Sequence, residues 1–147
     1  MGIEQLMKMD IEQLIPHRGG MKLIGEIVEI ADMRCVTASV ASPDWPLAAD
    51  GTVNSIILIE LIAQTAGAHF GWDELNKGKS TAGQAGWIVG IKESRFTWGR
   101  IPVHSKIITS IEEKNRLGTY SEIAGTAMID STIVAEIVLQ VFRTEAE

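Results

Sequence analysis

The segment IILIELIAQ, residues 56–64, places isoleucine, leucine and alanine on every side of a helix and one carboxylate, Glu60, in its middle. A helix that is apolar all round in a globular protein is packed inside it. The wider apolar stretch 53–70 approaches the about 20 residues that a membrane-spanning helix needs, but it contains several polar side chains, Asn54, Glu60, Gln64 and His69. The sequence therefore predicts a long helix enclosed by the rest of the protein, with Asn54 as its N-cap.

The segments on both sides of this helix are typical of β-strands. They are rich in Ile, Val and Thr, and turn residues separate the last of them at 114–118 and 130–131. A short helix is expected over 10–15, where Pro16 stops it. The predicted strands cover residues 21–30, 33–41, 86–98, 103–111, 119–129 and 133–142.

This order of elements predicts an α+β fold, in which an antiparallel sheet wraps around the helix within a single domain, residues 1–147. Gly67 and Gly71, four positions apart on the helix, would let another backbone approach or would end the helix. Such a sheet leaves an edge strand that must be covered. A homodimer that joins two sheets edge to edge is a common solution.

Composition excludes several classes of function. The net charge of −6 argues against general nucleic-acid binding, which needs a basic surface. The single cysteine, Cys35, cannot form an internal disulfide, and no charged-then-apolar leader is found at the start, so a cytoplasmic protein is expected. No cluster of Cys and His residues suggests a metal, and no cofactor is expected.

Four segments resemble the β-hydroxyacyl-acyl-carrier-protein dehydratases of fatty-acid synthesis, in the same order along the chain. LIPHRGGMKLIGEIVEI (14–30) resembles their Pro-His-Arg opening and first strand, and IELIAQTAG (59–67) resembles their central helix. VGIKESRFTWGRIPV (89–103) and VAEIVLQVF (134–142) resemble a later strand with its loop and the final strand. The resemblance implies the hot-dog fold, and the variant is similar to the divergent predicted dehydratases of aryl-polyene pigment clusters.

The resemblance also implies a reaction and a site. Members of the family remove water from a 3-hydroxyacyl thioester to form the trans-2-enoyl thioester, in acyl tunnels at a dimer interface that use a His of one subunit and a helix Glu of the other. Glu60 falls on that Glu, as the acid or acid/base, and Gln64 falls on a Gln one turn later that would orient it. The helix N-terminus near Ser55 and Ile56 would polarise the thioester carbonyl.

The chain departs from the family directly before the helix. Where the dehydratases have His-Phe-Pro-Gly, this chain has SPDWPLAADGTVNS (42–55), which contains no histidine. Asp44 takes the His position when the segments are aligned on the proline, and Asp50 is a further candidate for the base. Trp45 would line the tunnel mouth. A missing general base typically costs about 10²–10⁴ in rate, so the departure bears directly on activity.

Two alternatives follow from this departure. A hot-dog thioesterase would use Glu60 to activate water against the thioester carbonyl. A non-catalytic acyl-thioester binder, or a subunit that completes a heterodimer with a related dehydratase, would need no base of its own. His17 and Arg18 are interpreted as structural, and His69 and His104 as packing or surface residues.

The expected substrate is an acyl thioester of acyl carrier protein or of coenzyme A. Acyl carrier proteins are acidic, and the resemblance implies that they dock on a basic patch beside the tunnel. A locally basic stretch offers such a patch, although an ordinary solvated strand face explains it equally well. Its residues are Lys92, Arg95, Arg100 and Lys106.

Overall fold

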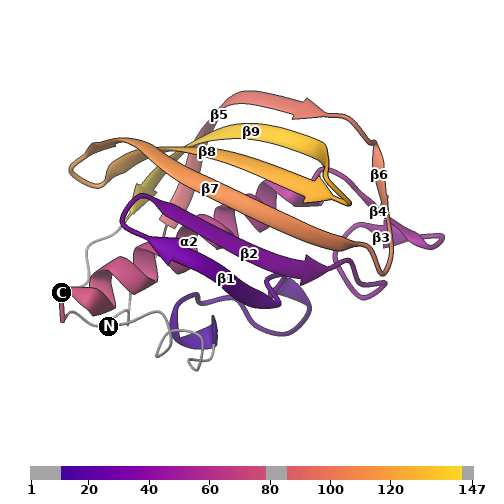
Figure 1. The fold of residues 1–147 in the computed structure, drawn as a ribbon, viewed down its shortest axis with the longest axis horizontal. Helices are drawn as coiled ribbons and strands as arrows, with labels where there is room; N and C mark the ends of the chain where they lie inside the picture. The colour runs from indigo at the N-terminus through magenta and orange to yellow at the C-terminus, as the bar shows by residue number, and fades with distance from the viewer. Residues whose placement is uncertain (1–10, 79–85, 144–147) are drawn as a thin grey trace.

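A computed structural model describes residues 11–78 and 86–143, and in it a curved six-stranded sheet wraps around one long helix (Figure 1). The sheet is antiparallel, and its strand order is β1-β2-β7-β8-β9-β5. This arrangement confirms the predicted α+β class and each of the predicted strands. The strands are β1 (Glu26–Ala31), β2 (Arg34–Val40), β5 (Gly86–Phe96), β7 (Lys106–Leu117), β8 (Tyr120–Ile129) and β9 (Thr132–Arg143).

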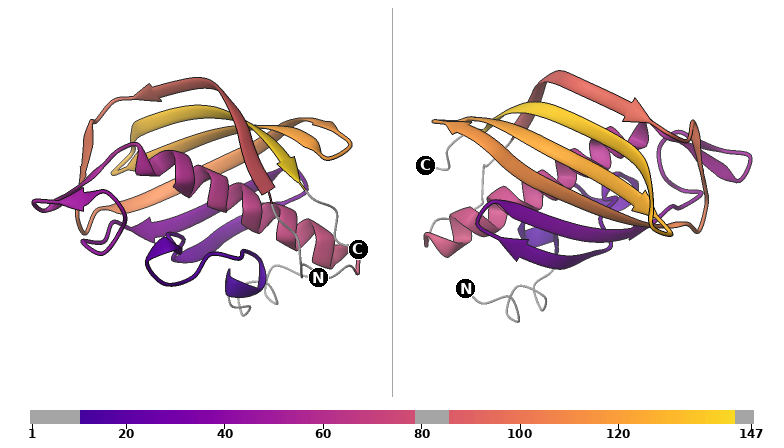
Figure 2. Two further views of the ribbon diagram at one scale, coloured as in Figure 1. Left: turned by 180° about the vertical axis from the view of Figure 1, so that it is seen from behind. Right: turned by 45° about the horizontal axis from the view of Figure 1, so that its top comes forward.

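The central helix α2 (Ile57–Asn76) lies in the concave face of the sheet, as both views of Figure 2 show. Its side chains are buried on most sides, as the apolar sequence predicted. The α-helix begins after Ile56, which is its N-cap, so the prediction of Asn54 as N-cap is wrong. The Oδ1 atom of Asn54 instead accepts a hydrogen bond from the Ile56 N–H (3.0 Å) in the turn before the helix. No helix in the described part of the chain is long and apolar enough to span a membrane.

The glycines of α2 allow the N-terminal segment to cross the helix closely, and neither ends it. A Cβ atom at Gly71 would lie 2.5 Å from the carbonyl oxygen of Leu14. At Gly67 it would lie 3.4 Å from the Cγ2 atom of Ile15, an ordinary contact. The backbone of Leu14 therefore reaches its position only because residue 71 has no side chain.

Several short elements were not predicted from the sequence. A small second sheet joins the segment before α2 to the segment after β5, and two single-turn 3₁₀ helices lie before β1. One of these replaces the helix expected over 10–15, of which residue 10 lies outside the described residues. These elements are η1 (Ile11–Gln13), η2 (Gly19–Met21), β3 (Ala48–Ala49), β4 (Thr52–Asn54) and β6 (Arg100–Pro102).

The turns between the last strands are tighter than the sequence suggested. Strand β7 continues to Leu117 and β8 begins at Tyr120, so the turn expected over 114–118 is a two-residue turn at 118–119. Gly118 has a φ of 61° in this turn. The predicted turn at Asp130 and Ser131 is confirmed, with φ of 48° and 68°. Positive φ at two consecutive positions is the geometry that matches the twist of a tight hairpin.

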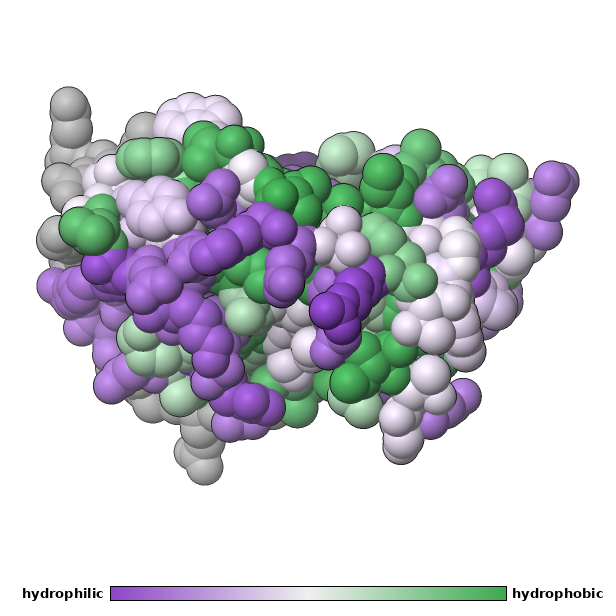
Figure 3. All heavy atoms as spheres, turned by 90° about the horizontal axis from the view of Figure 1, so that it is seen from above, coloured by the Kyte–Doolittle hydropathy of each residue, from purple (hydrophilic) through white to green (hydrophobic). Residues whose placement is uncertain are grey.

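Strand β5 forms one edge of the large sheet and exposes apolar side chains on both of its faces. Trp87 and Val89 are 54% and 56% exposed, and Ile88 and Ile91 are exposed as well. Figure 3, seen from the side of β5, shows hydrophobic patches interrupted by hydrophilic side chains. A long edge strand of this composition is suited to pairing with another chain.

A buried ion-pair cluster ties α2 to strands β7 and β8. Glu113 is fully buried, accepts hydrogen bonds from Arg116 (2.9 Å) and Ser121 (2.8 Å), and lies 3.4 Å from the Nε2 atom of His69. Burial alone would raise the pKa of Glu113, but the adjacent His69 and the hydrogen bonds from Arg116 and Ser121 lower that pKa to about 2. The packing interpretation of His69 agrees with its complete burial.

Candidate active site

Gln64 anchors the candidate site from inside the core. Its side chain is fully buried, its Oε1 atom accepts a hydrogen bond from the Leu23 N–H (2.9 Å), and its Nε2 atom donates to the carbonyl of Met21 (2.6 Å). The same Nε2 atom donates to Oε1 of Glu60 (3.1 Å). Both N–H groups of the amide are therefore occupied, one of them by Glu60, and the orienting role of Gln64 stays a prediction.

His17 lies against the same carboxylate. Its Nε2 atom is 3.0 Å from Oε1 of Glu60, and the two side chains are 30% and 33% exposed. The Nδ1 atom of His17 is buried and has no hydrogen-bond partner among the described residues. A histidine and a carboxyl group in direct contact, both reachable from outside, form a pair of the kind used in acid–base catalysis.

Arg18 holds the backbone that carries this histidine. Its Nη1 atom donates to the carbonyl oxygens of Ile15 and His17, and its Nη2 atom donates to that of Glu12, each at 2.8 Å. The structural interpretation of Arg18 agrees with these contacts. His17 was given the same structural interpretation, and its contact with Glu60 was not predicted from the sequence.

An apolar groove begins at this pair. It has a volume of about 350 Å³. One wall is the face of α2 that carries Glu60, Ala63, Gly67 and Phe70, and the opposite walls come from the segment 14–17 and from the ends of β5 and β9. The residues of these opposite walls are Leu14, Ile15, Pro16, His17, Gly86, Trp87, Ile88, Val141 and Arg143.

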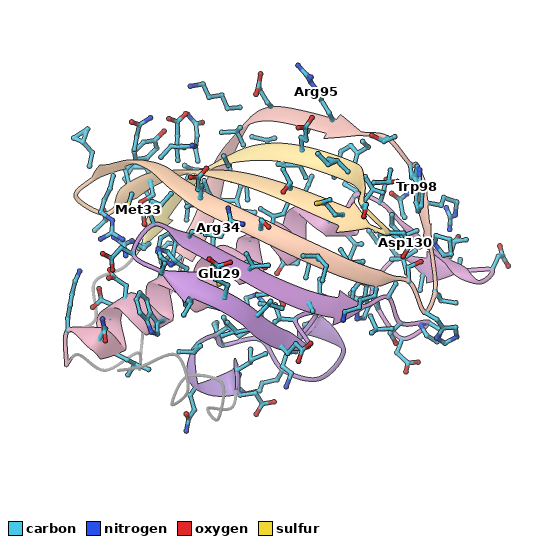
Figure 4. All side chains as sticks on the ribbon, viewed as in Figure 1. Glu29, Met33, Arg34, Arg95, Trp98 and Asp130 are labelled. Carbon is cyan, nitrogen blue, oxygen red and sulfur yellow. The ribbon has the colours of Figure 1, made fainter. Side chains whose placement is uncertain are left out.

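A second hollow, of about 430 Å³, lies on the outer face of the sheet. Charged side chains from four different strands line it, including Arg34 and Arg95, which both stand on the outside of the sheet in Figure 4. It does not reach Glu60 or His17. We assign the candidate site to the smaller groove, because only that groove combines an apolar wall with an acid–base pair.

The acidic residues before α2 lie elsewhere in this subunit. Asp44 and Asp50 are exposed in the turns around β3 and do not line the groove. Trp45 is buried in the core, with 7% exposure, and does not line the groove mouth either. Within one subunit, the structure therefore does not bring these residues to Glu60.

The backbone amides expected to bind the thioester carbonyl are already occupied. The Ser55 N–H donates to the carbonyl of Gly99 (3.1 Å), and the Ile56 N–H donates to Asn54 Oδ1. Neither residue lines the groove. The prediction that these amides polarise the substrate is therefore not supported within this subunit.

The basic residues considered for carrier-protein docking do not form one patch of free charges. Lys92 makes an ion pair with Glu122 (2.8 Å), and the Nε atom of Arg100 donates to the Thr52 hydroxyl. Arg95 lines the outer hollow and points away from the sheet at the β5 edge (Figure 4). Carrier-protein docking by these residues stays a prediction.

Comparisons with known proteins agree with the fold and with the resemblance seen in the sequence. The sequence model of a family described as ApeP-like, ApeP dehydratase, matches residues 9–147. The chain is 26% identical over 136 residues to the 3-hydroxyacyl-[acyl-carrier-protein] dehydratase FabZ of Streptococcus uberis, covering 86% of this chain and 89% of the relative. These matches confirm the expected relationship to the dehydratases.

Solved structures resemble the chain over most of its length. The dehydratase heterocomplex ApeI:P from Xenorhabdus doucetiae contains a chain with a TM-score of 0.85 at 17% identity, covering 93% of this chain and 92% of that one. A hypothetical thioesterase from Streptococcus pneumoniae, solved with coenzyme A, has a TM-score of 0.62 at 14% identity, covering 83% and 87%. At these identities the likeness shows the hot-dog fold, which was the fold expected.

Proposed function

This chain belongs to the ApeP-like dehydratase family, and we propose that it removes water from 3-hydroxyacyl thioesters with His17 and Glu60 as its base and acid. The observation that carries this proposal is the 3.0 Å contact between His17 Nε2 and Glu60 Oε1 at the mouth of an apolar groove. The pair supplies both proton-transfer groups that dehydration needs, although the segment 42–55 contains no histidine.

The reaction breaks a C–H bond beside the thioester carbonyl and a C–O bond at the next carbon. Neutral His17 accepts the α-proton on Nε2, and the electrons of the C–H bond form the double bond. Protonated Glu60 gives its proton to the departing hydroxyl, which leaves as water with the electrons of the C–O bond. The imidazolium then returns one proton to the carboxylate across the 3.0 Å contact, so the pair ends as it began.

Gln64 keeps the acid in place during this cycle. Its Nε2 donor stays on Oε1 of Glu60 while the buried backbone of Met21 and Leu23 holds the amide. Fixing a catalytic group in this way lowers the entropic cost of reaching the transition state. Gln64 is therefore a positioning residue.

The natural substrate we propose is an acyl thioester carried by an acyl carrier protein, in the cytoplasm. The 3-hydroxyacyl-[acyl-carrier-protein] dehydratase FabZ of Streptococcus uberis supports the class of substrate. Coenzyme A thioesters would enter the same groove, since the reacting part of the molecule is identical.

We also propose that the chain works as a dimer through the β5 edge, with itself or with a related hot-dog subunit. Support comes from the exposed Trp87, Ile88 and Val89 side chains, two of which line the groove that a partner strand would close. The relative solved as an ApeI:P heterocomplex supports a related subunit as partner. A Val89→Asp substitution should convert the dimer to monomer in light scattering, and an unchanged mass would reject β5 as the interface.

The catalytic roles are tested by separating proton removal from water loss. Dehydration of a short 3-hydroxyacyl thioester is followed by mass, and exchange of the α-proton in D₂O is followed by NMR on the saturated acyl thioester, which cannot lose water. Glu60→Gln should abolish dehydration and retain α-proton exchange. His17→Gln should abolish both. His104→Gln, at an exposed histidine outside the groove, is the matched control.

Other outcomes assign other functions. Normal dehydration by His17→Gln would reject His17 as the base and return attention to Asp44 of a partner subunit. Release of free thiol by the unmodified protein would identify a thioesterase. Binding of the thioester without turnover, in the homodimer and after addition of a related dehydratase subunit, would identify an acyl-thioester binder.

A further inference from the structure

The far end of the groove differs chemically from the rest of its wall. Glu60, Ala63, Gly67 and Phe70 follow one face of α2, so the groove extends along the helix for ten residues, about 15 Å at 1.5 Å per residue. An acyl chain that starts at the His17–Glu60 pair therefore has its other end near Phe70. The lining between these points is apolar, but Arg143 lies at the far end.

Arg143 stands over the ring of Phe70. Its guanidinium carbon is 4.5 Å from the ring centroid, and both residues line the groove. The side chain is half-buried, and its Nε atom is shielded from solvent without a hydrogen-bond partner among the described residues. An unpaired buried N–H is unfavourable, and a charged donor is the more costly kind to leave unpaired.

Three carboxylates, Glu113, Glu74 and Asp73, attract the Arg143 guanidinium electrostatically, and other cations engage two of them. Glu113 is bound by Arg116, and Asp73 makes ion pairs with Lys77 (3.1 Å) and Arg116 (3.3 Å). Burial, followed by repulsion from Arg116, lowers the pKa of Arg143. The guanidinium of Arg143 is thus a partly desolvated cation, and within residues 11–78 and 86–143 its Nε donor has no hydrogen-bond partner.

We propose that Arg143 binds an oxygen atom at the far end of the acyl chain, so that the enzyme prefers substrates whose chain ends in a hydrogen-bond acceptor over those that end in a methyl group. This inference rests on the dehydratase function proposed above. A methyl-ended chain of the same length would remove water from the guanidinium and give nothing in return. An oxygen acceptor, and a carboxylate most strongly, would form charge-assisted hydrogen bonds with the part of the guanidinium that lines the groove.

Two substrates of equal length test the inference. Both are 3-hydroxyacyl thioesters of N-acetylcysteamine long enough to span about 15 Å, one ending in a carboxylate and the other in a methyl group. The readout is the ratio of their kcat/KM values, because a general defect in folding or chemistry cancels in a ratio. A third, short substrate that ends before Phe70 reports whether the chemistry proceeds at all.

The unmodified enzyme should favour the carboxylate-ended chain by about 10- to 100-fold, the range expected for a hydrogen bond to a charged group. Arg143→Met, which keeps an unbranched apolar stem, should remove this preference, and Arg143→Lys should restore part of it. Arg34→Met is the matched control, since Arg34 is an exposed arginine on the outer face of the sheet (Figure 4).

An Arg143→Met variant with the same ratio as the unmodified enzyme would overturn the inference. If the short substrate were not converted, the dehydratase proposal would fail independently. Arg143 would then be tested by calorimetric binding of the two long thioesters to the unmodified protein and to Arg143→Met. Equal affinities of the unmodified protein for the two chains would again overturn the role of Arg143.

Discussion

Replacing Gly71 by alanine should displace His17 indirectly, through the backbone of Leu14. The added Cβ would lie 2.5 Å from the Leu14 carbonyl oxygen, whereas ordinary contacts begin at 3.4 Å, so the crossing backbone must retreat by about 0.9 Å. Leu14 lies only three residues before His17, and Pro16 stiffens the chain between them. The retreat should therefore reach the 3.0 Å contact between His17 and Glu60.

Two opposing effects determine the stability of this variant. Alanine is favoured over glycine inside a helix by about 1 kcal/mol, and overpacking against backbone costs about 1–3 kcal/mol. Gly67→Ala is the matched control, because the same helix gains the same propensity and the new methyl group meets Ile15 Cγ2 at 3.4 Å. Gly71→Ala should therefore be less stable than Gly67→Ala by about 1–3 kcal/mol.

The effect on turnover should be larger than the effect on stability. A misplacement of about 1 Å can cost about 10²-fold in rate, so Gly71→Ala should lose most of its dehydratase activity while it remains folded. Urea denaturation followed by circular dichroism measures the first quantity, and turnover of a short 3-hydroxyacyl thioester measures the second. If Gly71→Ala matched Gly67→Ala in stability and the unmodified enzyme in rate, the proposed transmission from the crossing to His17 would be wrong.

Further variants test the buried cluster, the N-terminal segment and the core. The folded-state pKa of Glu113 lies below its usual value of 4.5, so its ionised form should stabilise the folded protein by about 3 kcal/mol above about pH 4.5. This stabilisation should disappear as the pH falls toward 2. In Glu113→Gln, urea denaturation at several pH values should show a lower free energy of unfolding at pH 7 and a weaker dependence of that free energy on acid pH. Arg18→Met removes the hydrogen bonds that hold the backbone at His17, so turnover should fall by about 10-fold or more with little change in the denaturation midpoint, and full turnover would argue against the role of Arg18. Gly125→Ala places a methyl group against Ile62 in the core and should lower the free energy of unfolding by about 1–3 kcal/mol, and an unchanged midpoint would show that Ile62 moves aside freely.

The two polar positions of the central helix show how far sequence reasoning reached. Glu60 and Gln64 lie one helical turn apart, so their contact at 3.1 Å follows from the geometry of a single helix. Hydrophobic periodicity likewise indicated the buried helix and the strands around it, because alternation and helical spacing are properties of neighbouring residues. The family resemblance added the class of reaction.

Only the tertiary structure decided which distant groups meet. His17 reaches Glu60, 43 positions away, because Gly71 admits the crossing backbone and Arg18 holds its turn. Arg143 comes from the last strand to the far end of the same groove, and the carbonyl of the distant Gly99 occupies the amide of Ser55. Local pattern determines which segments form helices and strands, whereas contacts between remote side chains depend on how those elements pack, and that packing brings the acid–base pair together.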